Sequence, residues 1–275
     1  MNLYRSLLFV LLLATFESCI ASSFPSWAEK EIMWRHGSAL APKVGNGVTR
    51  YVYLYPTDRP IRTDYREAME WSALTLKDWY TDQLDGEYTF KLPIPIVQSV
   101  ALDHPASFYG SNNPGGSEYL IFWNNVLNEA FPKTGATFND PSNVWIFFVD
   151  AGAGCNQLSG GGTSGIVVLS HNDLRGLIGD EFLDCNGVEY PPWTFTPQRW
   201  IGGQGHELGH AYGLPHPPGC DDGLPKCDYD ALMWTGFYNG FPNSTYLRED
   251  EKPILIAGTY FQSIDSDVIF RNGFE

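Results

Sequence analysis

The part of this chain that most constrains its fold is the stretch HELGHAYGLPH at residues 206–216. On a helix, residues four apart lie on one face, so His206 and His210 can direct two imidazoles at one metal ion. Glu207 lies beside them, where a carboxylate can act as a base rather than as a ligand. The spacing therefore predicts a helix that carries a zinc site with its own base.

A third ligand is expected from the residues that follow this helix. Gly213 allows the left-handed backbone conformation that ends a helix, and the chain can then return His216 to the metal. Aspartate also binds zinc, so Asp221 and Asp222 remain alternatives. We favour His216, because its offset of six from the second histidine matches a chain that turns at the glycine. Three imidazoles leave a fourth zinc position for water.

These eleven residues resemble H-E-x-x-H-x-x-G-x-x-H, the extended signature of the metzincin clan of zinc endopeptidases. Metzincins also have a methionine below the metal, in a segment called the Met-turn, and Met233 follows His216 by 17 residues. The resemblance covers residues 199–233 and is specific to the clan, not to one family within it. It implies hydrolysis of peptide bonds by one catalytic Zn²⁺, bound by the three histidines, with Glu207 as the general base.

The resemblance also implies a fold class. This is an α/β (α+β) domain of two lobes, with a mixed twisted sheet, a zinc-binding active-site helix and a C-terminal helix. The upper lobe would extend to about residue 216, and the lower lobe would follow it. In such a domain the substrate adds to an edge of the sheet as an antiparallel strand, and we place this edge near residues 165–170.

The periodicity of apolar residues separately indicates a mixed α/β order. We predict strands at 48–55, 143–149 and 165–170, an extended segment at 90–101, and helices at 64–83, 117–130 and 250–262. Residues 152–165 are rich in Gly and Ser and lack the lysine of a phosphate-binding loop. We expect this segment to be a loop at the rim of the cleft.

The N-terminus has the features of a secretory signal peptide. Arg5 precedes an apolar run at residues 6–16, and Ala21 ends a small-residue cleavage site. We therefore predict that residues 1–21 are removed and that the protein is secreted to the extracellular space, or alternatively to the periplasm. A lipidated Cys19 is the other alternative. No later apolar run is long enough to cross a bilayer, so we expect no membrane contact after removal of the signal peptide.

Four cysteines follow the signal peptide, and in an exported protein they indicate two disulfides with three connectivities. We predict the pairs Cys155–Cys185 and Cys220–Cys227, because the second pair flanks a short turn and the first pair lies in loop-like sequence. A second zinc site built from these thiols is the alternative, although the chain has no C-x-x-C pair to support it.

Length and charge limit the domain organisation and the partners. Residues 22–264 are enough for one catalytic domain, and residues 265–275 are predicted to be a short tail. The formal net charge of −15 argues against nucleic acid as a partner. We expect a monomer that binds a protein or peptide substrate. The acidic segment 221–230 would also suit Ca²⁺, but without EF-hand spacing a solvated acidic loop is favoured.

Two other functions fit the same motif. One is a zinc hydrolase that acts on an amide other than a peptide bond. The other is a secreted binding protein that keeps the zinc site as a scaffold and presents its many aromatic side chains to a partner. Glu207 favours an enzyme over the binding protein, because a scaffold needs no base.

Overall fold

The computed structural model of the chain describes residues 47–180, 196–238 and 240–264. All of them lie in the larger of two compact units, Leu40–Glu275. The predicted signal peptide, Cys185 and the predicted C-terminal tail lie outside the described residues.

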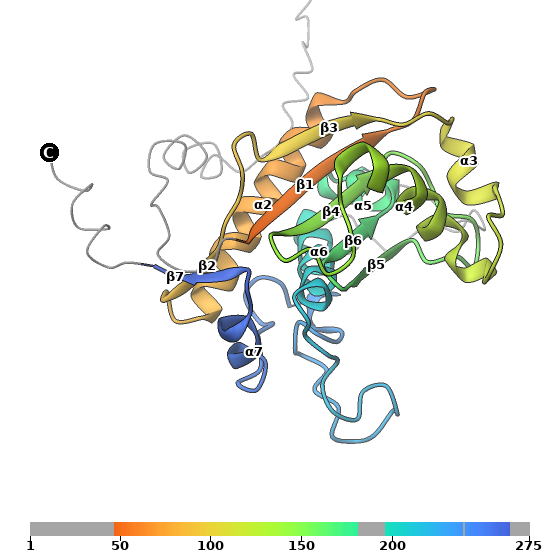
Figure 1. Cartoon of the computed structure of the whole chain (residues 1–275). Coiled ribbons are helices and arrows are strands. Elements are labelled where there is room, and N and C mark those ends of the chain that lie inside the picture. The colour runs from red at the N-terminus through yellow and green to blue at the C-terminus, as the bar shows by residue number, and fades with distance from the viewer. Residues whose placement is uncertain (1–46, 181–195, 239, 265–275) are drawn as a thin grey trace, which may run out of the picture. The chain divides into compact units, whose positions relative to one another are not determined.

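Strands and helices alternate through most of the chain (Figure 1). They are β1 (Val48–Tyr55), α2 (Thr63–Gln83), β2 (Tyr88–Phe90), β3 (Val97–Ala101), α3 (Ala106–Ser111), η1 (Glu118–Leu120), α4 (Ile121–Thr134), β4 (Asn143–Val149), β5 (Gly160–Thr163), β6 (Ile166–Leu169), α5 (His171–Leu177), α6 (Pro197–Ala211), η3 (Gly236–Tyr238), α7 (Lys252–Ala257) and β7 (Phe261–Ser263). None of the helices in the described ranges is long and apolar enough to cross a membrane.

The central sheet has five strands in the order β3-β1-β4-β6-β5. The first four run parallel, and β5 is antiparallel to β6. The two central strands, β1 and β4, are nearly continuous runs of buried residues, as expected for strands that are covered on both faces. The predicted α/β class with a mixed sheet is therefore confirmed.

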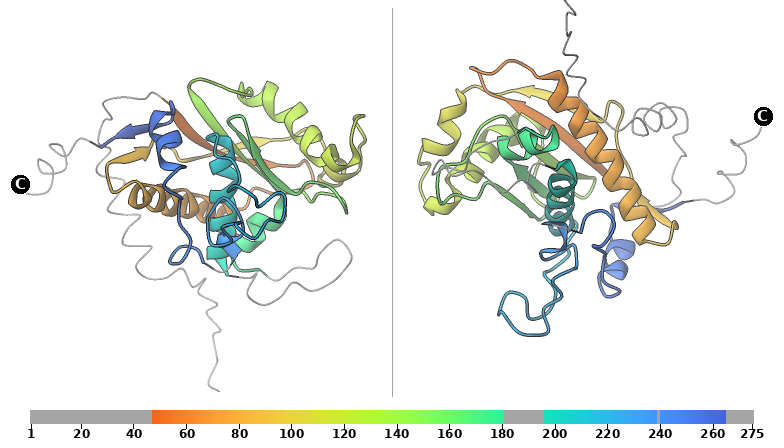
Figure 2. Two further views of the ribbon diagram at one scale, coloured as in Figure 1. Left: turned by 90° about the horizontal axis from the view of Figure 1, so that it is seen from below. Right: turned by 180° about the vertical axis from the view of Figure 1, so that it is seen from behind.

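Helices cover both faces of this sheet (Figure 2). On one face α4 packs over Val52 and Leu54 of β1, together with α3. On the other face α2, α5 and α6 pack against one another. The Tyr80 hydroxyl of α2 donates to the carbonyl oxygen of Gly205 (2.8 Å), and the Gln204 amide donates to the Tyr51 hydroxyl of β1 (2.6 Å). These buried hydrogen bonds fix α6 against both α2 and the sheet.

The chain after α6 is built differently. We call residues 212–238 and 240–260 the turn region, and residues 47–180 and 196–211 the sheet region. In its described residues the turn region has only the short helices η3 and α7 and one isolated bridge, between Ala231 and Tyr246. It ends where β7 pairs antiparallel with β2 in a separate two-stranded sheet.

One expectation about the sheet is wrong, and it concerns the substrate platform. The segment expected to be a loop contains β5, whose sequence is GGGT. Because β5 pairs with β6, residues 166–169 are internal to the sheet, and the edge predicted at residues 165–170 is instead β5. Glycine has a low strand propensity, so this strand forms through pairing with its neighbour and not through its own sequence.

Two other boundaries also differ from the prediction. The extended segment predicted at residues 90–101 contains the last residue of β2 and all of β3, two strands that belong to different sheets and are separated by Pro93 and Pro95. Proline cannot donate to a ladder, which accounts for the break. The C-terminal helix predicted at residues 250–262 is wrong in length, because α7 ends at Ala257 and the next residues form β7.

Candidate metal centre

Helix α6 holds the first two histidines of the motif. It begins at Pro197, whose fixed φ suits the first turn of a helix. The chain leaves it at Gly213, which has a φ of +99°, the left-handed conformation predicted there. His206 and His210 lie on one face of α6, and their ring centroids are 4.7 Å apart.

Three imidazole nitrogens converge beside this face. The Nε2 atom of His210 lies 3.1 Å from Nε2 of His206 and 3.0 Å from Nε2 of His216. Nitrogen ligands of a tetrahedral zinc, each about 2.0–2.1 Å from the metal, are about 3.3 Å apart, so a small widening of this cluster would admit the ion. Within the described ranges, these histidines are the one cluster of His, Cys, Asp or Glu side chains that could hold a metal. The donor set and spacing fit zinc.

The other ring nitrogen of each histidine, Nδ1, also lies within hydrogen-bonding distance of an oxygen atom. His206 Nδ1 lies 2.8 Å from the carbonyl oxygen of Leu232, and His210 Nδ1 lies 2.9 Å from that of Leu214. His216 Nδ1 lies 2.6 Å from a carboxylate oxygen of Asp221. A carbonyl oxygen only accepts, so the first two Nδ1 atoms donate, which leaves their Nε2 lone pairs free for a metal.

Burial keeps the helix histidines neutral. It lowers the pKa of His206 to about 3, and the neighbouring His210 lowers it further. The pKa of His210 is also lowered, again chiefly by burial. Neutral imidazole is the form that binds a metal ion. The fold therefore keeps these two side chains ready for a cation at neutral pH.

Glu207 lies next to these histidines and faces β5. Burial raises the pKa of Glu207 to about 7, and the negative charge of Asp173 on α5 adds to the rise. A backbone N–H of Gly162 and the positive charge of Arg199 act in the opposite direction. A carboxyl group with a pKa near neutrality can both accept and release a proton at physiological pH.

The edge strand β5 packs directly on α6. A Cβ atom at Gly162 would overlap the backbone carbonyl oxygen of Glu207. Only glycine permits this approach, and it places the backbone of an edge strand beside the candidate base. The sequence motif contains no sign of this contact, because the two glycine-rich segments are brought together only by the tertiary fold.

Three side chains of the turn region pack against the histidines and the helix that carries two of them. Met233 is completely buried, and its Sδ atom packs against Gly209 of α6. The Trp234 ring meets His216 edge-on, with centroids 5.0 Å apart, and the Phe237 ring lies 5.1 Å from that of His206. The sequence did not indicate the contacts of the two aromatic rings, and the assignment of Met233 to a Met-turn stays a prediction.

Two acidic residues near the site have roles that the sequence did not indicate. Asp173 is buried and raises the pKa of Glu207, although it lies on a separate helix with no motif of its own. Asp221 was an alternative third ligand, but its carboxylate contacts Nδ1 of His216, the nitrogen opposite the cluster. The structure thus groups His216, and neither Asp221 nor Asp222, with the two helix histidines.

A groove of about 430 Å³ opens beside His210. It is lined by residues 162–165, at the turn between β5 and β6, and by residues 210–215, at the end of α6 and just after it. Asn139 and Tyr260 complete the lining. The end of the edge strand and one of the three histidines, His210, therefore line the same groove.

The cysteine predictions have different outcomes. Cys220 and Cys227 form the predicted disulfide, with an S–S distance of 2.09 Å. Cys155 is also disulfide-bonded, but its predicted partner, Cys185, lies outside the described residues, so that pairing stays a prediction.

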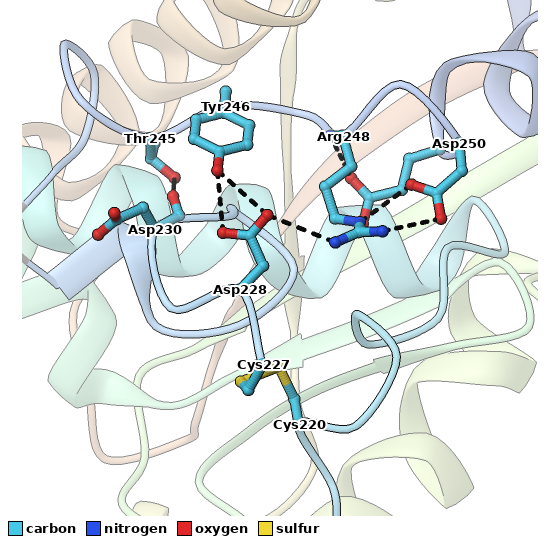
Figure 3. Close-up of polar contacts among 9 residues, drawn as sticks. Cys220, Cys227, Asp228, Asp230, Thr245, Tyr246, Arg248 and Asp250 are labelled. Atoms are coloured by element: carbon cyan, nitrogen blue, oxygen red, sulfur yellow. Dashed lines mark hydrogen bonds and ion pairs between the residues drawn. A yellow bond between two sulfur atoms is a disulfide. The ribbon is translucent and has the colours of Figure 1, made fainter. Parts of the chain in front are cut away.

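The acidic segment after His216 is only partly a solvated loop (Figure 3). Asp221 and Asp222 are exposed, but Asp228 accepts hydrogen bonds from the Tyr246 hydroxyl (2.9 Å) and from Arg248 (3.4 Å). The partners of the Asp228 carboxylate are thus the Tyr246 hydroxyl group and the Arg248 guanidinium group. Such partners satisfy the carboxylate without a metal ion.

Comparison with known proteins gives no family for this chain. No protein-family model matches it, and no curated protein matches it. Several solved structures are similar to it in part, and they include zinc-dependent peptidases.

OgpA from Akkermansia muciniphila is 18% identical, with a TM-score of 0.49, and the similarity covers 84% of this chain and 66% of OgpA. Another OgpA structure, of a catalytically inactive form, contains an O-glycopeptide substrate. Archaemetzincin from Methanopyrus kandleri is 15% identical (TM-score 0.42; coverage 79% and 98%). A zinc-dependent peptidase from Methanocorpusculum labreanum is 10% identical (TM-score 0.29; coverage 74% and 99%). The chain spans slightly less than two thirds of OgpA, and similarities at this level assign no activity to it.

Proposed function

We propose that this protein is a zinc-dependent endopeptidase. The observation that supports the proposal most directly is the convergence of three Nε2 atoms beside a partly buried carboxyl group. His206, His210 and His216 would hold one zinc ion, which, when bound, activates water and polarises a carbonyl group. A structural zinc site would use a fourth protein ligand, and within the described residues the cluster offers three.

Glu207 is the proposed general base. Its raised pKa suits a group that takes a proton from water and later delivers it to the leaving amine. The Gly162 N–H holds the carboxyl group at the edge of β5, and Asp173 keeps the affinity of Glu207 for a proton high. Met233 would support the histidines from below, through its packing on α6.

The proposed substrate is an extended segment of a protein or peptide. An extended chain could pair with the backbone of β5, because within the described ranges β5 has a strand on one side only. The groove beside His210 continues along the turn after β5, so the same chain would pass the histidines. Backbone pairing would select extended peptides as a class, but it would not select a particular amino-acid sequence in the substrate.

Export of the protein is part of the proposal. The Cys220–Cys227 disulfide supports it, because disulfides persist mainly in oxidising compartments outside the cytosol.

Glu207→Gln tests the proposed reaction. This substitution removes the base and keeps all three histidines, so the variant should bind zinc as the wild type does. Its cleavage of an unfolded protein should fall by about 10²- to 10⁴-fold. Zinc content is measured by metal analysis, and new N-termini are mapped to show that internal peptide bonds are cut.

Glu67→Gln is the matched control, since Glu67 is exposed on α2 in the sheet region. It should retain both zinc and activity. Full activity of Glu207→Gln would contradict the assignment of the base. A protein that binds zinc but releases no new N-termini would instead favour a hydrolase of another amide or a binding protein.

A further inference from the structure

The three histidines are not held equally. His206 and His210 belong to α6, and each contacts a backbone carbonyl of a buried residue, Leu232 or Leu214. His216 comes from the chain after the helix, and its side chain is 29% exposed. Within the described residues, the partner of its other ring nitrogen, Nδ1, is the side chain of Asp221 (2.6 Å), which is 70% exposed. An exposed side chain therefore orients the third histidine, whereas backbone carbonyl groups orient the other two.

The position of Asp221 is set by a small ring. Asp221 follows Cys220, which is buried and bonded to Cys227, also buried, across a sequence separation of seven. Inside the ring, the Gly223 N–H donates to the carbonyl oxygen of Cys220 (3.0 Å), which closes a turn around Asp221. The disulfide and this turn restrict where the carboxylate can lie.

The ring is in turn fixed to the rest of the turn region (Figure 3). Asp228 follows Cys227 and accepts hydrogen bonds from Tyr246 (2.9 Å) and Arg248 (3.4 Å). The Arg248 guanidinium also pairs with Asp250 (2.9 Å), just before α7. A continuous set of contacts therefore runs from the start of α7, through the disulfide, to the third histidine.

We propose that Asp221 is the positioning residue for His216 and that the Cys220–Cys227 ring holds Asp221 in place. This inference rests on the proposed zinc site. A carboxylate on Nδ1 fixes the tautomer and orientation of an imidazole and raises the basicity of its Nε2 atom. An exposed ion pair contributes little to folding stability, so the effect of Asp221 should appear in metal affinity and not in the stability of the metal-free protein.

Zinc affinity of the purified chain, measured by competition with a chromophoric chelator, tests this role. Asp221→Ala should weaken zinc binding by about 10- to 100-fold, and Asp221→Asn by less, because its amide oxygen can still accept the hydrogen bond. Asp222→Ala is the matched control: the next residue in the ring is equally acidic and exposed, and its loss should change affinity by less than about 2-fold. Thermal midpoints of the metal-free variants should agree with that of the wild type.

The role of the ring is tested by combining substitutions. Cys220→Ala with Cys227→Ala should weaken zinc binding by a factor similar to that of Asp221→Ala. Adding Asp221→Ala to the cysteine variant should then cause little further loss, because residues that act through one contact are not additive. Fully additive losses would show that the disulfide does not act through Asp221.

The two levels of the proposal fail in different ways. If the wild type binds zinc and Asp221→Ala binds it equally well, the positioning role is overturned and the zinc site stands. If the wild type binds no zinc, or His206→Ala binds as much as the wild type, the zinc site itself is wrong. Neither result depends on finding a substrate.

Discussion

The sheet region and the turn region meet at the histidine cluster, and they are stabilised by different means. The sheet region has five paired strands covered by helices, with long runs of buried apolar side chains. The turn region has few paired strands, and it combines a disulfide with a smaller set of buried apolar side chains, among them Leu232, Met233 and Leu247. Burial of apolar surface and strand pairing stabilise the first region, whereas the second depends on less apolar burial and on a covalent bridge.

This difference shows how the candidate centre divides its tasks. The sheet region supplies two histidines, the carboxyl group and the edge strand, all on elements that are fixed by packing. The turn region supplies the third histidine and the Leu232 carbonyl group that orients His206. A metal ion bound at the junction would therefore link a rigid part of the molecule to a less rigid one.

Removal of the metal should show the largest difference between the regions. At zinc concentrations a thousandfold above the dissociation constant, bound zinc adds about 4 kcal/mol to the free energy of unfolding, and a chelator removes this contribution. Hydrogen exchange should accelerate most in residues 214–235, because they are tied to the sheet region through His216 and Leu232. Equal acceleration in β1 and β4 would contradict the division into a rigid and a less rigid region.

Gly162→Ala should have the next largest effect, and it acts on the sheet region. The new Cβ atom would overlap the Glu207 carbonyl oxygen, so β5 must move away from α6. We expect a loss of about 3 kcal/mol, the upper end for overpacking, in chemical denaturation. Gly160→Ala in the same strand is the control, since its Cβ atom would meet only the Leu169 side chain at 3.4 Å. Equal losses for the two variants would show that β5 does not depend on this close approach.

Removal of the Cys220–Cys227 disulfide should destabilise the protein by about 2–3 kcal/mol, the value expected for a loop of this size. Cys220→Ala with Cys227→Ala is preferable to a reducing agent, because Cys155 is also disulfide-bonded. Hydrogen exchange should locate the effect in the turn region and leave β4 protected. A loss of protection in the central strands would mean that the two regions unfold together.

The smallest expected effect is on how folding stability depends on pH, and it comes from Glu251, at the start of α7. Burial raises the pKa of Glu251 to about 7 from an ordinary value of 4.5. Between these values the folded state binds more protons than the unfolded state, so this group lowers stability as pH rises from about 4.5 to 7.

Glu251→Gln should therefore match the wild type near pH 4.5 and exceed it above pH 7, by on the order of 1 kcal/mol. Thermal unfolding at the two pH values measures the difference, with Glu67→Gln as the exposed control. A variant that is less stable than the wild type at pH 8 would show that the Glu251 carboxylate is stabilised by contacts as an ion.

The features that the sequence predicted well are those fixed by local pattern. The strands at residues 48–55 and 143–149 match β1 and β4 to the residue, because both segments are rich in β-branched and aromatic residues. The helix predicted at 64–83 begins only one residue late. The spacing of the motif likewise placed His206 and His210 on one helical face.

The features that it did not predict depend on distant contacts. Three of the four residues of β5 are glycines, which disfavour strands, and β5 forms through its pairing with β6. Asp173 reaches Glu207 only because α5 and α6 pack together. The sequence offered Asp221 as an alternative metal ligand. Spacing along the chain cannot distinguish a residue that binds the metal from one that hydrogen-bonds to a metal-binding histidine.

The turn region is anchored at both ends: it begins at the end of α6, and it leads into β7, which pairs with β2. The chain leaves the end of α6 and returns to β2, which packs next to α2, so the turn region is a loop with both ends fixed. If the contacts within this loop open, the fixed ends keep His216 near the two helix histidines, because bringing a loop of a few dozen residues back together has a modest entropic cost. Metal could therefore be lost and regained many times without the molecule having to fold again.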